Sequence, residues 1–188
     1  ARLQPGILET IARPAERRLA WHEYGAIFLK PDRIEAGRAF LRRHRATLDE
    51  AEDRYGVDPA HVVAILGVET FYGRITGRHR VLDALATLAF DYPPRASFFR
   101  GELREAFLLA REEATPIAAL TGSYAGAMGW GQFIPSSYRA YAVDFDGDGD
   151  RDIWEDPADA IGSVAHYLAR HGWRRGEAVA VRLPGAER

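Results

Sequence analysis

The carboxyl group with the most distinctive surroundings in this sequence is that of Glu69, which follows the apolar run 62–68. On a helix, Glu69 lies one turn beyond Ile65 and projects from an apolar stripe. An isolated carboxylate there is costly unless it is paired with a cation or kept protonated. Glu69 is therefore either a general acid with a raised pKa or an ordinary glutamate paired with Arg74 or Arg78.

The helix that carries Glu69 has a clear start in the sequence. Asp58 is a good N-cap, and Pro59 suits the first helical position, where a missing N–H costs nothing. Gly73 is the expected stop. Because residues 62–68 are apolar all round, the pattern predicts a helix enclosed by protein on every side.

A second group of carboxylates could bind a metal ion. Counted from Asp144, aspartates fall at positions one, three, five, seven and nine, and Gly149 falls at position six, where a calcium loop turns sharply. Hard oxygen ligands in a flexible loop favour calcium over magnesium or zinc. The expected ligands are Asp144, Asp146, Asp148, Asp150 through its backbone carbonyl, and Asp152, with Glu155 at position twelve.

The alternative for this stretch is an exposed acidic turn. However, five aspartates at alternate positions repel one another unless a cation lies among them. Only one such loop is present, so we expect one structural calcium ion that holds a loop, not a paired calcium sensor. The six histidines form no comparable cluster, and a chain without cysteine has no disulfides, thiol catalysis or zinc–thiolate sites.

The stretch 121–135 combines glycine with aromatic residues. It is not a phosphate-binding loop, because it lacks the Gly-Lys-Ser/Thr ending and no strand precedes it. Its glycines suit positive φ and close backbone approach, and its aromatic rings supply flat faces. We therefore expect it to line a ligand cleft. The residues concerned are Gly126, Gly129, Gly131, Tyr124, Trp130 and Phe133.

The rest of the pattern is mainly helical. The apolar spacing predicts helices at 32–55, 81–90, 95–113 and 157–171. Gly56 ends the first of these helices, and the prolines after Tyr92 break the second. Before residue 31, short helical pieces alternate with breaks at Pro5, Pro14 and Pro31. Residues 178–183 are a weak strand candidate.

The composition indicates an ordinary globular chain: 188 residues, 47% hydrophobic and 28% charged, with a net charge of −2. That charge does not favour nucleic acid or an anionic membrane as a partner. No apolar run approaches the ~20 residues that a membrane span needs. No signal peptide is visible, although a first residue of Ala suggests a processed or trimmed chain.

Four further motifs stand out along the chain: Gly67–Thr70, Leu82–Leu88, Gly122–Tyr138 and Asp159–Tyr167. Taken together they resemble the lytic murein transglycosylase B family, bacterial cell-wall enzymes with a goose-type lysozyme-like core. The resemblance extends from about Ile7 to Trp173. It implies a mainly α fold with a lysozyme-like helical core, an EF-hand-like calcium loop and little β structure.

The resemblance implies cleavage of the β-1,4 bond between N-acetylmuramic acid and N-acetylglucosamine in peptidoglycan, giving a 1,6-anhydromuramoyl end. Its single catalytic acid matches Glu69. Ordinary glycosidases need a second carboxylate, and neither Asp83 nor Asp91 can be assigned that role from sequence. The alternatives are a hydrolytic muramidase on the same scaffold and a non-catalytic wall-binding module.

The resemblance also implies further site residues. Those that match substrate-binding positions are Tyr24, Arg95, Ser123, Gln132 and Tyr167. The two tyrosines could instead be core aromatics. Asp159 matches a carboxylate that helps to close the calcium site, and we prefer it to Glu155 for that role.

Three features depart from the family. Pro94 stands where a second arginine is common, Phe98 stands where a tyrosine is common, and the chain stops soon after Trp173. We expect residues 1–57 to form an N-terminal helical lobe and residues 58–188 a catalytic core with the calcium loop at 144–159, together one compact unit. The family further implies a location in the bacterial periplasm or envelope, glycan strands as partner, and a monomer.

Overall fold

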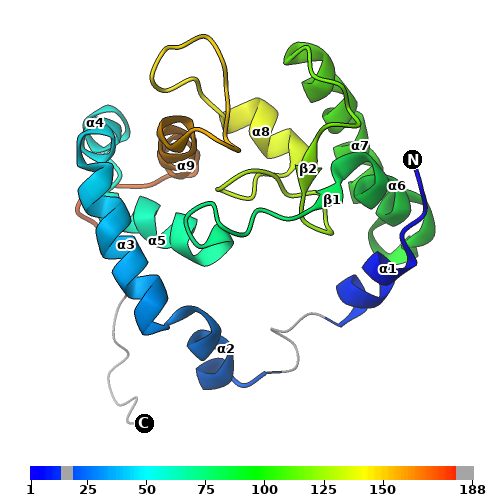
Figure 1. The fold of residues 1–188 in the computed structure, drawn as a ribbon, viewed down its shortest axis with the longest axis horizontal. Helices are drawn as coiled ribbons and strands as arrows, with labels where there is room; N and C mark the ends of the chain where they lie inside the picture. The colour runs from blue at the N-terminus through cyan, green and yellow to red at the C-terminus, as the bar shows by residue number, and fades with distance from the viewer. Residues whose placement is uncertain (14–18, 181–188) are drawn as a thin grey trace.

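The computed structural model of this protein describes residues 1–13 and 19–180 (Figure 1). Helices dominate and strands are few, so the predicted mainly α fold is confirmed. Within the described residues, no helix has both the length and the apolar character needed to cross a membrane. The helices are α1 Pro5–Ala12, α2 Trp21–Phe28, α3 Pro31–Arg43, α4 Arg45–Tyr55, α5 Pro59–Thr70, α6 Val81–Asp91, α7 Ala96–Glu112, α8 Pro135–Tyr141 and α9 Pro157–Arg170.

Helix α5 lies in the middle of the molecule, with α3, α4 and α9 packed against it (Figure 1). Its start is as predicted: the Asp58 carboxylate accepts a hydrogen bond from Ala60 N at 2.7 Å, and Pro59 is the first helical residue. The expected enclosure on every side is wrong. Val68 is 44% exposed, and Glu69 is exposed as well and lines a groove.

The end of α5 also differs from the prediction. The helix stops at Thr70, not at Gly73, because Phe71 and Tyr72 both take left-handed backbone conformations before the glycine does. The bulky Tyr72 ring packs against Gly67 of the same helix, and Gly73 lies against the Trp130 ring. Tertiary packing, not a glycine stop, terminates this helix.

The long helix predicted over 32–55 is two helices. It breaks at His44 (φ −105°, ψ 26°), whose ring contacts that of Phe40 at a centroid distance of 4.4 Å. The break lets α3 pack on α5 while α4 packs on α9. Gly56 ends α4 with φ 71°, as predicted. Pro5 and Pro31 begin helices rather than break them, and Pro14 lies outside the described residues.

Helices α6 and α7 pack against each other along their length, and α1 packs on α6. Ahead of α6, strand β1 (His79–Arg80) pairs antiparallel with β2 (Thr121–Gly122). This two-residue pairing was not predicted. The strand expected at 178–183 is wrong for residues 178–180, which form no strand, and its remaining residues lie outside the described part.

The glycine-rich stretch leads into α8, a short helix that the sequence analysis missed although Pro135 is a typical first helical residue. Gly126 and Gly129 have positive φ as predicted, whereas Gly131 does not. Gly131 instead permits close approach, since a side chain there would meet Phe133 and Val164. The division into 1–57 and 58–188 stays a prediction.

Candidate functional site

Glu69 lies at one wall of a pocket of about 380 Å³ between α5, α8 and α9. The walls are mostly apolar, and Glu69 is the only carboxyl group that lines it among the described residues. Neither Asp83 nor Asp91 contributes: Asp83 is buried elsewhere and accepts a hydrogen bond from Arg2 N. The lining residues are Ile65, Glu69, Gly131, Gln132, Phe133, Ile134, Ser137, Val164 and Tyr167.

The surroundings of Glu69 raise the pKa of its carboxyl group, and the cause is burial among protein atoms. The side chain is nevertheless exposed towards the groove, so the carboxyl group is accessible while part of its hydration is lost. Within residues 1–13 and 19–180 it forms no ion pair or side-chain hydrogen bond. The alternative that Arg74 neutralises it is not supported, since that guanidinium lies over the Phe71 ring at 4.6 Å.

The residue after Glu69 anchors the end of α5 to the glycine-rich stretch. Buried Thr70 donates from Oγ1 to Trp130 O at 2.9 Å and accepts from Gly73 N at 3.1 Å. Trp130 is itself held by its ring N–H, which donates to Trp154 O at 2.6 Å. These bonds join three segments that are distant in sequence and fix the position from which Glu69 projects.

Gln132 lies across the pocket from this helix and has a left-handed backbone (φ 51°). Its Nε2 donates to Thr76 O at 3.2 Å and to Gly129 O at 3.0 Å. The amide is therefore oriented by the protein, which leaves Oε1 as the atom able to accept a hydrogen bond from a ligand.

Tyr167 lines the same pocket from α9. The His171 ring stacks on it at a centroid distance of 4.0 Å, and Phe133 packs edge-on at 5.8 Å. One face of the tyrosine is thus already covered. Its hydroxyl, more than its ring face, is the group available to a ligand.

The structure does not bring the other predicted substrate residues into this pocket. Tyr24 lies on α2, with its ring near those of Trp21 and Phe28. The Arg95 guanidinium stacks over Phe98 at 4.3 Å. Ser123 Oγ accepts hydrogen bonds from the backbone of its own turn, from Ala127 N at 3.1 Å and Ala125 N at 3.3 Å.

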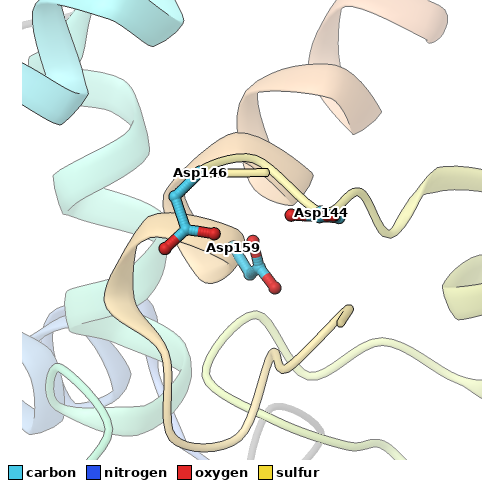
Figure 2. A group of neighbouring side chains, drawn as sticks. All are labelled: Asp144, Asp146 and Asp159. Atoms are coloured by element: carbon cyan, nitrogen blue, oxygen red, sulfur yellow. The ribbon is translucent and has the colours of Figure 1, made fainter. Parts of the chain in front are cut away.

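The acidic loop forms a second cluster. Carboxylate oxygens of Asp144, Asp146 and Asp159 lie within 4.8 Å of one another, and Figure 2 shows Asp159 reaching from the start of α9 towards the loop. Gly149 turns the loop with φ 99°, as its position predicts. Asp159 is buried, and its two oxygens accept from Phe145 N at 2.6 Å and Asp152 N at 2.7 Å.

This donor set fits calcium, because three hard carboxylates converge and backbone bonds fix their orientation. Burial raises the pKa of Asp159 to about 6, with the nearby carboxylates adding to the effect. A bound cation would stabilise the ionised carboxylate and so offset the free-energy cost of burying its charge.

A second acidic triplet overlaps the first and consists of Asp146, Asp148 and Asp156. Asp156, which the sequence analysis missed, caps α9 by accepting from Ala158 N at 2.6 Å. The Asp-Pro pair at its helix start was the available signal. Neither Asp150 nor Glu155 supplies a carboxylate to either triplet.

Comparison with known proteins places these features in one family. Residues 1–187 match the family model described as Transglycosylase SLT domain. Membrane-bound lytic murein transglycosylase B of Escherichia coli strain K12 is 52% identical over 166 residues, which are 88% of this chain and 46% of that protein.

Solved structures of lytic transglycosylases share the fold of this chain. Soluble lytic transglycosylase SltB1 from Pseudomonas aeruginosa superposes with a TM-score of 0.90 at 59% identity, over 94% of this chain and 60% of that one. Escherichia coli lytic transglycosylase Slt35 in complex with calcium superposes with a TM-score of 0.87 at 47% identity. The match covers 95% of this chain and 56% of that one. SltB3 from Pseudomonas aeruginosa in complex with NAG-anhNAM-pentapeptide superposes with a TM-score of 0.84 at 40% identity. The match covers 94% of this chain and 47% of that one.

The helical scaffold described above is thus the fold of these lytic transglycosylase structures. The chain belongs to the transglycosylase SLT domain family, and the resemblance noted in its sequence is confirmed. It spans about half the length of the curated relative that it matches.

Proposed function

We propose that this protein is a peptidoglycan lytic transglycosylase that cleaves the β-1,4 bond between N-acetylmuramic acid and N-acetylglucosamine. The observation that carries the proposal is Glu69: one carboxyl group with a raised pKa, in a pocket to which no second carboxylate of residues 1–13 and 19–180 contributes. The relatives named above, all lytic transglycosylases, support the same reaction class.

Protonated Glu69 donates its proton to the glycosidic oxygen as the bond from that oxygen to C1 breaks. Because Glu69 is the only carboxylate that the described part of the chain brings to the pocket, the substrate's own N-acetyl oxygen stabilises C1. Glu69, now ionised, takes the proton from the C6 hydroxyl as O6 attacks C1. The proton returns to Glu69, no water is consumed, and a 1,6-anhydro ring results.

Polar groups around the pocket suit a saccharide. We propose that Gln132 accepts a hydrogen bond from the sugar through Oε1 and that Tyr167 contributes its hydroxyl. Tyr24, Arg95 and Ser123 are proposed to contact parts of the glycan strand more distant from the cleaved bond. SltB3, solved with NAG-anhNAM-pentapeptide, supports glycan strands as the partner.

We propose one structural calcium ion, held by Asp144, Asp146 and Asp159, with Asp148 and the Asp150 carbonyl completing the loop ligands. The calcium complex of Slt35 supports this assignment. The relative named as membrane-bound supports a location in the bacterial envelope, and we propose the periplasm. A monomer stays our expectation.

The decisive experiment is product analysis of digested peptidoglycan by mass spectrometry. The proposal predicts anhydromuramoyl ends, and Glu69→Gln should lower turnover at least about 100-fold while glycan binding persists. Reducing muramic ends would indicate a hydrolytic muramidase instead. If Glu69→Gln altered no measurable property, the chain would be a wall-binding module.

A further inference from the structure

Arg33 on α3 reaches the end of the helix that carries Glu69. Its Nη1 donates to Gly67 O at 3.0 Å and to Val68 O at 3.3 Å, the carbonyls of the two residues directly before Glu69. Carbonyls in the last turn of a helix lack intrahelical donors. The backbone N–H groups of residues 71–75 all donate to acceptors other than Val68 O. Arg33 therefore supplies a donor to Val68 O that the turn does not.

Arg33 also contacts the turn that follows Glu69. Its guanidinium lies over the Phe71 ring at 4.9 Å, and its own backbone carbonyl accepts a hydrogen bond from the Tyr72 hydroxyl at 3.3 Å. Phe71 and Tyr72 are consecutive non-glycine residues with positive φ, 53° and 57°. Strained backbone of this kind persists only where its surroundings hold it. The Arg33 side chain thus contacts the chain on both sides of Glu69, at the carbonyls before it and at Phe71 after it, whereas the bond to Tyr72 comes from the backbone and does not depend on the side chain.

The same guanidinium lies over the Phe28 ring of α2 at 5.5 Å. Helix α2 has no buried residue, so contacts of this kind decide how it is held. Phe28 packs edge-on against Tyr24 at a centroid distance of 5.3 Å. Arg33 therefore connects the end of α5 with the helix that carries Tyr24.

We propose that Arg33 is a positioning residue for glycan cleavage, which orients Glu69 through the end of α5 and Tyr24 through α2. The inference rests on the proposed function. Arg33 acts through geometry and not through its charge, because a planar guanidinium can donate to carbonyls in its plane while stacking on rings above and below it. Lysine offers neither the fork nor the stacking surface.

The test compares Arg33→Met and Arg33→Lys with a matched control, Arg38→Met, on the same helix. Arg38 is 68% exposed and pairs only with Glu35 among the described residues. Release of anhydro products from purified glycan strands is measured far below the melting temperature of each variant. We expect kcat to fall about 10- to 100-fold for Arg33→Met, since small misplacements of a catalytic group cost that much.

Arg33→Lys should recover little activity, Arg38→Met should match the unmutated protein, and the pH dependence should not shift. A double-mutant cycle with Tyr24→Phe should give non-additive effects on KM if α2 is held as described. Arg33→Met with unchanged kcat and a lower melting temperature, full recovery by lysine, or additive effects in the cycle would overturn the inference. Absence of anhydro products from the unmutated protein would instead overturn the proposed function.

Discussion

At the scale of single residues, the site depends on how one carboxyl group is solvated. Glu69 lies in a groove that removes part of its hydration, and no residue in the described part of the chain supplies it with a counter-charge. Such surroundings keep the carboxyl group protonated to higher pH, as the proposed mechanism requires, but they also make its ionised form unfavourable in the folded state.

This cost predicts a pH-dependent difference in stability between the protein and Glu69→Gln. Because the folded-state pKa of Glu69 is raised, the carboxyl group destabilises the folded protein above that pKa, and the penalty disappears below the unfolded-state pKa of about 4.3. Glu69→Gln should therefore melt at a higher temperature than the unmutated protein at about pH 8, and at the same temperature at about pH 4. Thermal unfolding of both proteins at the two pH values measures this. A lower melting temperature for Glu69→Gln at the higher pH would contradict it.

Activity should follow the same ionisation. The proposed mechanism requires the acid form of Glu69, so kcat/KM should fall as pH rises through its raised pKa, at higher pH than a solvated glutamate would titrate. Initial rates on glycan strands across this range give the profile. A basic limb at the ordinary glutamate value would show that burial does not control the acid.

At the scale of elements, α7 and α8 are joined by a buried carboxylate. Glu102 on α7 accepts from Ser136 N at 3.0 Å and from Ser136 Oγ at 2.8 Å, and so satisfies the first turn of α8. Ser137, the next residue, lines the Glu69 pocket. Glu102 therefore stabilises the α8 wall of the groove, although it does not line the groove itself.

Glu102→Ala should lower the free energy of unfolding by about 1–3 kcal/mol, because it leaves the partly buried N–H and hydroxyl of Ser136 without the carboxylate that accepts their hydrogen bonds. Glu102→Gln keeps one acceptor oxygen, so it should lower the free energy of unfolding by less than Glu102→Ala does. Urea unfolding measures both, with the exposed Glu50→Ala as a control expected to change stability by about 0.5 kcal/mol or less. Equal losses for Ala and Gln would contradict the hydrogen-bond explanation.

The elements also show how far one sequence can be interpreted. Asp58, Pro59, Gly56 and the start of α9 follow from local chemistry and were predicted. The break at His44 and the end of α5 depend on what α4 and Tyr72 pack against, which spacing within one segment does not reveal. Arg33, Ser137 and Val164 were missed for the same reason: each acquires its role through contact with a segment far away in the chain.

At the scale of the whole molecule, the acidic loop should link calcium to stability. If an ion binds only the folded state, a concentration about 100 times the dissociation constant adds about 2.7 kcal/mol. For a chain of this size, that corresponds to a melting temperature higher by roughly 5–10 °C. We therefore expect chelation to lower the melting temperature by that amount and calcium, added back, to restore it.

Two variants locate the ion. Asp159→Asn should abolish the response to calcium, whereas Glu155→Gln should keep it, because Glu155 lies outside both acidic triplets. Calorimetry with and without chelator distinguishes them. Loss of the response in Glu155→Gln alone would move the closing ligand to the twelfth loop position.

Helix α9 contributes residues both to the acidic cluster and to the groove that holds Glu69. Asp159 sits in its first turn, while Val164 and Tyr167, one and two turns further on, form a wall of the groove. An engineer who shortened the acidic loop to make a smaller protein would displace the backbone amides of Phe145 and Asp152 relative to each other, and Asp159, which accepts from both, would no longer hold the start of the helix in place. A shortened variant would therefore need a new contact to hold the start of α9 before the smaller protein could be stable.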